Sequence, residues 1–315
     1  MSLIDKASKK EWVKGGFNSL GQTDRNGQIQ ILENNNLRLV LSVSGNTPIK
    51  YASTITFYAK SNNIDFKNEI LQNFNEPIYW NYSINLSNTS VSHEEIGAVI
   101  KAAPVSQGGH YADKRSRVDH LTANHFISIQ NQTHTAVISN LDALFFKLGN
   151  STPDTLDYQN STIRFLVGGQ IDKEFKLGVV NQGGDSLFVN HFSFKPFYTK
   201  IDMATAMKTA FEHQNPLLYQ EAKGPKTTAM PQLSNFLSTS DSDQILYTLK
   251  PAEDGGSLCR FWNLSENAKE YSIKTSLGSN TTLATHVETP IQNLAKDATL
   301  KANTQQIVSL LLHNK

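Results

Sequence analysis

The stretch YTLKPAEDGGSLCRFWNLSENAKEYSIKT, residues 247–275, decides the fold class. Apolar and polar residues alternate on both sides of the turn Asp254-Gly255-Gly256, and a second turn follows at residues 265–267. Alternation with a period of two is typical of strands with one buried face, and a short Asp-Gly turn between two such runs is typical of a β-hairpin. We therefore expect a hairpin followed by a further strand in this stretch.

The same pattern recurs along most of the chain. QIQILE at 28–33 and LRLVLSV at 37–43 flank three consecutive asparagines, which predicts another hairpin. In IDFKNEI, residues 64–70, the apolar side chains fall on every second position, so they share one face of a strand. Many short strands joined by polar turns are typical of antiparallel sandwiches.

One helix is expected, from about residue 202 to residue 213. Ala204, Met207 and Phe211 recur at helical spacing, and Asp202 is placed to cap the first turn. The helix should end before Asn215-Pro216, because the residue before a proline avoids helical backbone angles.

These patterns predict a mainly β protein with four parts. Residues 1–27 are expected to be an irregular entry, and 28–200 a large antiparallel two-sheet sandwich. Residues 201–234 are expected to hold the short helix and a linker, and 235–315 a smaller β-sandwich.

The composition excludes several classes of function. The net charge is +1 and no basic run is interleaved with aromatic residues, so we expect no nucleic-acid partner. No run approaches the roughly 18 apolar residues of a membrane span. The single cysteine, Cys259, excludes a disulfide framework within the chain, and its place in an expected strand favours a small core residue.

No spacing of residues indicates catalysis or metal binding. The nine histidines are scattered, and His120 and His125 lack the spacing of a helical zinc motif. Glu94 and Glu95 are adjacent, so in a strand their side chains would point to opposite faces. We expect neither a catalytic residue nor a metal ligand set in this chain.

The alternation stops between residues 103 and 124, where a long polar loop is expected. Loops on a rigid β scaffold often carry binding residues. This loop combines aromatic and hydrogen-bonding side chains, as sugar recognition requires. The candidate ligand-binding residues are His110, Tyr111, Asp113, Arg115, Arg117 and His120. The alternative is a solvated loop with internal salt bridges.

Six segments, taken in order, resemble the C-terminal half of glycoside hydrolase family 38, the α-mannosidases. They are TITFYAKSNNIDFKNEI (54–70), EEIGAVIKAAP (94–104), HTAVISNLD (134–142), TAFEHQNPLL (209–218), FLSTSDSDQILYTLKPAEDGGSLCRFWNLSENAKEYSIKT (236–275), and ATHVETPIQN with QQIVSLLLH (284–293 and 305–313). The resemblance runs from about residue 28 to the C-terminus, and KPAEDGGSLCRFWN carries most of it.

The resemblance implies a large sandwich of the galactose-mutarotase-like kind, called a supersandwich, followed by a smaller β-domain. It implies a parent enzyme that is a zinc-dependent, retaining α-mannosidase. The family's zinc ligands and catalytic aspartates lie in an N-terminal catalytic domain, and no segment here is similar to that domain. The implied partners are therefore the protein's own N-terminal catalytic domain and an α-mannoside or other carbohydrate. The chain alone is expected to be inactive and to contribute side chains to the rim of the sugar site.

Two alternatives remain open. The chain could be a free-standing carbohydrate-binding β-protein with a groove lined by aromatic rings. It could also be a mutarotase-like enzyme, which needs a histidine acid and a carboxylate base in one pocket. His191 and Asp185 are the pair to consider for that chemistry, although Asp185 follows two glycines in a turn-like sequence.

Overall fold

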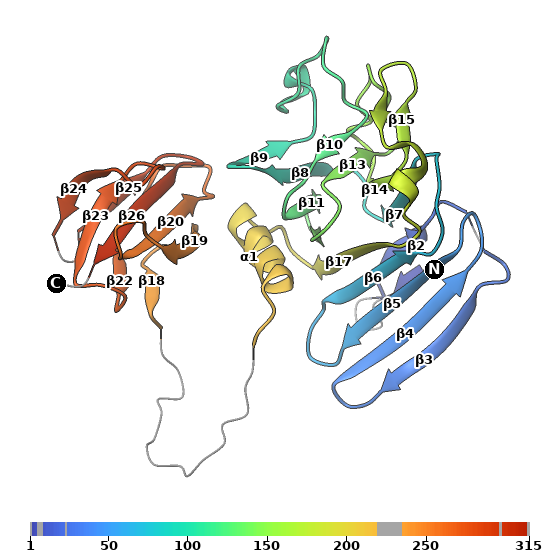
Figure 1. Ribbon diagram of the computed structural model, residues 1–315, viewed down its shortest axis with the longest axis horizontal. Coiled ribbons are helices and arrows are strands. Elements are labelled where there is room, and N and C mark those ends of the chain that lie inside the picture. Colours follow the sequence, from blue (N-terminus) through green and yellow to red (C-terminus); the bar gives the residue numbers. More distant parts are fainter. Residues whose placement is uncertain (1, 5–8, 23, 219–234, 296–297, 314–315) are drawn as a thin grey trace. The chain divides into compact units, whose positions relative to one another are not determined.

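The computed structural model describes residues 2–4, 9–22, 24–218, 235–295 and 298–313 (Figure 1). The chain divides into two compact units. The larger unit comprises residues 1–96, 100–201 and 209–214, and the smaller unit comprises 97–99, 202–208 and 215–315. The described residues form antiparallel sheets and one α-helix, which confirms the expected mainly β fold class.

The larger unit is built on two sheets. The first, with nine strands, runs in the order β3 (Gln28–Asn34), β4 (Arg38–Gly45), β5 (Tyr51–Tyr58), β6 (Ile64–Ile70), β17 (Phe188–Phe197), β12 (Thr135–Asn140), β11 (Phe126–Gln130), β8 (Ser90–Glu95) and β9 (Ala98–Lys101). The second, with six strands, runs in the order β1 (Ser2–Ile4), β2 (Glu11–Ser19), β7 (Ile78–Ile84), β14 (Thr162–Gly168), β13 (Phe145–Leu148) and β10 (Leu121–Thr122). A small hairpin pairs β15 (Gln170–Asp172) with β16 (Leu177–Gly178).

The inner faces of the two sheets meet through a core of aromatic side chains. In β6 the burial alternates, and Ile64, Phe66 and Ile70 face the core as the period of two predicts. Tyr82 of β7 contacts Phe66 and Phe192 of the opposite sheet edge to face, with ring centroids 5.7 and 5.4 Å apart. Such edge-to-face pairs stabilise the core beyond the area that they bury.

The expectation of an irregular entry is corrected for residues 11–19. They form β2, which pairs with β7 and buries Trp12, Val13 and Phe17. Irregularities on either side of Phe17 interrupt the pairing, and Gly16 and Asn18 have φ angles of 61° and 46°. These bulges break the alternation of apolar and polar residues, so the period-two pattern does not predict this strand.

The α-helix α1 (Met203–Gln214) begins and ends within one residue of the prediction. The Asp202 carboxylate accepts a hydrogen bond of 2.7 Å from the backbone N–H of Thr205, which is the third residue of the helix. Asp202 is therefore the N-cap that the sequence indicated. Two short 3₁₀ helices, η1 (Val105–Gln107) and η2 (Val180–Gly184), lie in loops of the larger unit.

The smaller unit contains one sheet of five strands and two strand pairs. The five-stranded sheet runs in the order β19 (Gln244–Pro251), β20 (Ser257–Asn263), β26 (Ile307–His313), β23 (Asn280–Ala284) and β24 (Pro290–Leu294). The pairs are β18 (Leu237–Thr239) with β22 (Ile273–Thr275), and β21 (Lys269–Tyr271) with β25 (Leu300–Ala302). β19 and β20 form the hairpin expected around Asp254-Gly255-Gly256.

Asn263, at the end of the RFWN sequence, is the polar centre of the smaller unit. Its side chain is fully buried, and its amide nitrogen donates to the carbonyls of Asn267, Ala302 and Asn303 at 2.9–3.2 Å. Its amide oxygen accepts from Gln244 Nε2 and from the backbone N–H of Ser265, each at 3.1 Å. One side chain thus joins β19, β20, the turn after β20 and the end of β25.

Replacing this hub should be costly. We predict that Asn263→Leu lowers the free energy of unfolding by about 3 kcal/mol or more, because several buried carbonyl and amide groups lose their partner. Urea denaturation followed by circular dichroism measures the loss. Asn267→Ala is the matched control, because the Asn267 side chain is exposed, and it should change stability by less than about 0.5 kcal/mol. Equal effects of the two variants would contradict the hub role of Asn263.

Candidate functional site

The loop that follows β9 folds back on itself. The backbone N–H of Tyr111 donates to Ala103 O at 3.1 Å, and the Tyr111 carbonyl accepts from the N–H of Val105 at 2.8 Å. Gly109 packs so closely that a Cβ there would lie 1.9 Å from Ala103 O, so only glycine fits. These contacts give the loop a defined shape around Tyr111.

Tyr111 is anchored to the core by a buried histidine. Its hydroxyl lies 3.0 Å from Nε2 of His93, and the two rings stack with centroids 6.1 Å apart. Burial raises the pKa of the Tyr111 hydroxyl, and burial lowers the pKa of His93 to about 4. Both groups are therefore neutral near pH 7, and the tyrosine ring forms a fixed wall.

A cavity of about 370 Å³ lies against this wall. Tyr111 and Tyr158 are its aromatic residues, and its charged residues are Asp113, Lys114, Arg115 and Asp154. Lys114, Arg115 and Asp154 make no hydrogen bond or ion pair with another described residue, so their polar groups are available to a ligand. Aromatic faces next to free donors and acceptors can bind both the C–H face and the hydroxyls of a sugar.

The six sequence-predicted residues do not form one cluster. Tyr111, Asp113 and Arg115 line the cavity, with Asp113 accepting hydrogen bonds from the hydroxyl and the N–H of Ser106. The exposed His110 is not among the lining residues, and its Nδ1 accepts a hydrogen bond of 2.8 Å from the N–H of Lys101.

Arg117 and His120 belong to a separate ion-pair network. Arg117 bonds both carboxylate oxygens of Asp119, at 2.8 and 3.0 Å, and also reaches Asp172 at 3.1 Å. His120 Nε2 lies 2.8 Å from the Tyr79 hydroxyl, and burial lowers the pKa of His120. Burial is the largest single influence on Asp119 and opposes its ionisation, but the hydrogen bonds and charge of Arg117 together with the interactions with His120 outweigh burial and lower the pKa of Asp119. Arg117 therefore matches the salt-bridge alternative, whereas the His120 ring is neutral near pH 7 and is held by its contact with the Tyr79 hydroxyl.

Sequence reasoning missed Lys114, Asp154 and Tyr158. Asp154 and Tyr158 come from the turn between β13 and β14, which is about forty residues from the loop that carries Tyr111. An aromatic residue in a polar turn was the available signal for Tyr158. Nothing in the spacing of these residues indicates that the two loops meet.

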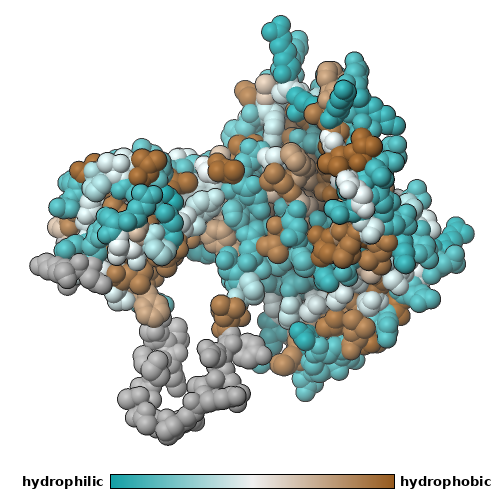
Figure 2. Space-filling view, in the orientation of Figure 1, coloured by the Kyte–Doolittle hydropathy of each residue, from teal (hydrophilic) through white to brown (hydrophobic). Residues whose placement is uncertain are grey.

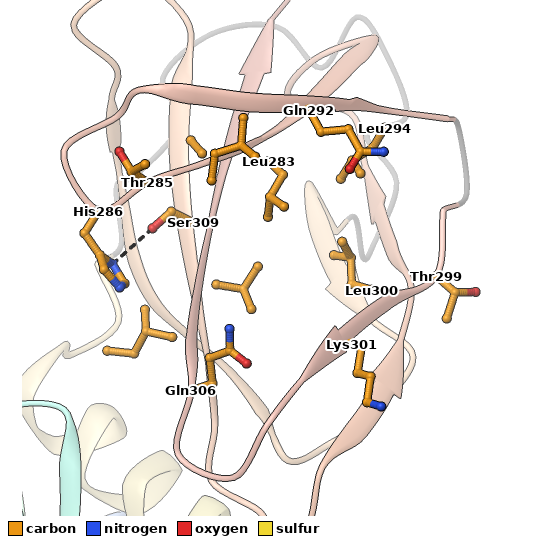
Figure 3. Close-up of a pocket in the computed structure, with 14 residues that line it drawn as sticks. Leu283, Thr285, His286, Gln292, Leu294, Thr299, Leu300, Lys301, Gln306 and Ser309 are labelled. Carbon is orange, nitrogen blue, oxygen red and sulfur yellow. Dashed lines mark hydrogen bonds between the residues drawn. The ribbon is translucent and has the colours of Figure 1, made fainter.

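Another cavity, of about 590 Å³, lies in the smaller unit and has a different character (Figure 3). Leu283 and Leu300 project into the space, whereas Thr299 and Lys301 point away from it. The imidazole of His286 is the one aromatic ring among the lining residues, and none of them carries a carboxylate. This cavity lacks the stacking surface that sugar sites use.

The described residues contain no group of three His, Cys, Asp or Glu side chains placed to hold a metal ion.

Glu94 is fully buried and accepts a 2.6 Å hydrogen bond from Nδ1 of His125. Glu95 is partly exposed and accepts a hydrogen bond from the Thr122 hydroxyl. Burial raises the pKa of the Cys259 thiol to about 11, so this thiol is protonated and unreactive at pH 7. No described helix is long and apolar enough to cross a membrane.

The pair considered for mutarotase-like chemistry is separated in the structure. His191 Nδ1 pairs with Asp142, not with Asp185, at 2.7 Å. Asp185 lies at the end of η2, where its carbonyl accepts a hydrogen bond from Asn73. The pair of His191 and Asp185 therefore does not form an acid and base in one pocket.

Comparison with known proteins places the fold. No family model and no curated protein matches the chain. An α-mannosidase from Enterococcus faecalis V583 matches 99% of this chain with a TM-score of 0.67 at 10% sequence identity. A protein of glycosyl hydrolase family 38 from Enterococcus faecalis matches 99% of it with a TM-score of 0.69 at 12% identity. A putative aldose 1-epimerase from Escherichia coli K12 matches 62% with a TM-score of 0.35 at 10% identity.

The chain spans only 40% and 42% of the two longer structures that it matches. The fold that the family resemblance implies is thus confirmed over nearly the whole chain. It corresponds to one part of each of these longer structures.

The burial of His93 generates a prediction about pH. Its pKa falls from 6.5 to about 4 on folding, so its contribution to stability is present above pH 6.5 and is lost as the pH falls toward 4. We predict that His93→Gln reduces the loss of stability between pH 7 and pH 5 by about 1–2 kcal/mol. Urea titrations at the two pH values measure it. An unchanged pH dependence of stability in His93→Gln would contradict this prediction.

Proposed function

We propose that this chain is the β-sheet region of a zinc-dependent, retaining α-mannosidase. In this proposal it supports, and partly lines, an active site whose catalytic residues and zinc ligands belong to another domain of the same protein. The observation that carries the proposal is the match of 99% of the chain to about two fifths of an α-mannosidase structure. The segments from 54 to 313 that resemble the family support the same conclusion.

An exposed apolar segment in the larger unit supports a role beside another domain. Several large apolar side chains between residues 175 and 187 are exposed, and Phe175 is 68% accessible. The set comprises Phe175, Leu177, Val179, Val180 and Leu187. Figure 2 shows hydrophobic patches among hydrophilic residues on the larger unit. Contiguous exposed apolar surface is typical of sites that pack against another domain or protein.

The cavity beside Tyr111 is the proposed contribution to sugar binding. It offers the Tyr111 and Tyr158 rings, the carboxylates of Asp113 and Asp154, and the guanidinium of Arg115. These groups can hydrogen-bond to a sugar and stack on it, but they do not form the pair of an acid and a nucleophile that cleavage of a glycosidic bond requires. Their role is therefore to bind and orient an α-mannoside at the rim of the site, while bond cleavage depends on the other domain.

The free-standing carbohydrate-binding protein is the second candidate function, and the same cavity favours it. Under that alternative, the chain alone binds mannose or mannobiose, and the gene encodes no catalytic domain. Calorimetric titration of the chain with both sugars and reading of the complete gene separate the two candidates.

The proposed function predicts an activity that depends on the intact protein. The 315-residue chain should not hydrolyse 4-nitrophenyl α-D-mannopyranoside. The full gene product should hydrolyse it, lose activity on chelation, regain it with zinc, and release the α-anomer first as seen by proton NMR. Hydrolysis by the chain alone, or an intact protein without α-mannosidase activity, would show the proposal to be wrong.

The rim role predicts a specific kinetic change. In the intact enzyme, Asp154→Ala should raise KM for the α-mannoside about 3- to 10-fold, the loss expected for one hydrogen bond, with kcat nearly unchanged. Lys60→Ala is a suitable control because Lys60 is exposed in a distant turn and does not line the cavity. An unchanged KM in the Asp154 variant removes that residue from the sugar site.

A further inference from the structure

The turn before β3 contains the one Asn-Gly pair of the chain, Asn26-Gly27. Both residues are exposed. β3 is the outermost strand of the nine-stranded sheet and pairs with β4 alone among the described strands (Figure 1). The turn can therefore change its conformation without disturbing a strand in the middle of the sheet.

The side chain of Asn26 is free to meet the backbone that follows it. Its own backbone N–H donates to Asp24 Oδ1 at 2.9 Å, whereas its side-chain amide makes no hydrogen bond with any described residue. The N–H of Gly27 is held only weakly, because Gly27 N lies 3.4 Å from Asp24 O, longer than the usual separation of about 2.9–3.0 Å. Since glycine has no Cβ, nothing on residue 27 shields its nitrogen from the side-chain carbonyl of Asn26.

Three other asparagines also precede a small residue, but their side chains are held in place. Asn18, Asn150 and Asn160 are each followed by serine. The side-chain oxygen of Asn18 accepts two hydrogen bonds, at 2.6 and 2.9 Å. The side-chain oxygen of Asn150 accepts one from Arg164 at 2.8 Å, and Nδ2 of Asn160 donates to Asp157 at 3.0 Å. These bonds restrain the rotation that would bring each side chain onto the following backbone nitrogen.

We propose that Asn26 is a site of spontaneous deamidation and isoaspartate formation in the folded protein. The amide nitrogen of Gly27 gives up its proton to hydroxide and attacks Cγ of Asn26. The new C–N bond forms, the bond from Cγ to Nδ2 breaks, and ammonia leaves with a proton taken from water. A second water then opens the five-membered imide at one of its two carbonyls, which gives aspartate or isoaspartate.

The modification changes the charge and the backbone of this turn. It replaces a neutral amide by a carboxylate, so the net charge falls by one, from +1 to 0. The isoaspartate product also adds a methylene to the main chain two residues after Asp24. The Asp24 carboxylate accepts the N–H groups of Asn46 and Thr47, so the change lies where the turn is joined to the loop between β4 and β5. The site goes beyond the proposed function, because it requires neither a ligand nor another domain.

Incubation of the purified 315-residue chain at pH 8, followed by peptide mass spectrometry, tests the proposal. Asn26 should convert at least about tenfold faster than Asn18, Asn150 or Asn160. Electron-transfer fragmentation distinguishes isoaspartate from aspartate, and both should form. Conversion should be slower at pH 6, because the attack requires a deprotonated backbone amide.

Two variants test the roles of the paired residues. Gly27→Ala should slow conversion at least about tenfold, because the added methyl group shields the attacking nitrogen. Gly27 is not among the glycines with positive φ, and a Cβ there would lie 3.4 Å from the nearest atoms, so alanine fits the turn. Asn26→Gln should remove the more acidic species that ion-exchange chromatography separates from the aged chain, and it keeps this test open if Gly27→Ala does not fold.

A parallel incubation in urea tests the contribution of the fold. Unfolding releases the side chains of the three serine-followed asparagines, so their rates should rise by a larger factor than the rate of Asn26. The proposal is overturned if Asn26 stays intact in the folded chain but converts in urea, if it converts no faster than those three residues, or if Gly27→Ala converts as fast as the wild type.

Discussion

The packing of the two sheets in the larger unit depends on the side chain of Tyr82. Its ring is fully buried between the two sheets and meets Phe17 and Phe165 of its own sheet as well as Phe66 and Phe192 of the other. Its hydroxyl donates to Asn18, which holds the bulged part of β2. Burial raises the pKa of this hydroxyl, so it remains a donor. The ring of Tyr82 thus contacts both sheets, and its hydroxyl holds the bulged part of β2 against them.

The loop cavity depends on the same scaffold in a less direct way. β8 delivers His93 to the core face, and His93 in turn fixes the ring of Tyr111 at the surface. The turn between β13 and β14 brings Tyr158 and Asp154 to the cavity that Tyr111 also lines. The rigid strands therefore determine where the binding groups lie, while the loops determine what those groups are.

Sequence periodicity predicted the elements whose burial alternates, such as β6, and the helix that Asp202 caps. It missed β2, because bulges around Phe17 shift the buried face. In the candidate site it identified Tyr111, Asp113 and Arg115, since they share one polar loop. It could not separate Arg117 and His120 from them or add Tyr158, because these outcomes depend on contacts between distant segments. The pairing of His191 with Asp142 was hidden for the same reason.

The placement of the three tryptophans has a consequence for the study of folding. Trp12 and Trp80 belong to the larger unit, and Trp262 belongs to the smaller one. All three are almost completely shielded from water, so the emission of each shifts to longer wavelength when its surroundings unfold. A variant in which Trp262 is the sole tryptophan, excited at a wavelength that tyrosine does not absorb, reports on the smaller unit alone. A second variant that keeps only Trp12 and Trp80 reports on the larger unit. Comparing the unfolding transitions of the two variants shows whether the two units unfold in one cooperative step or in two.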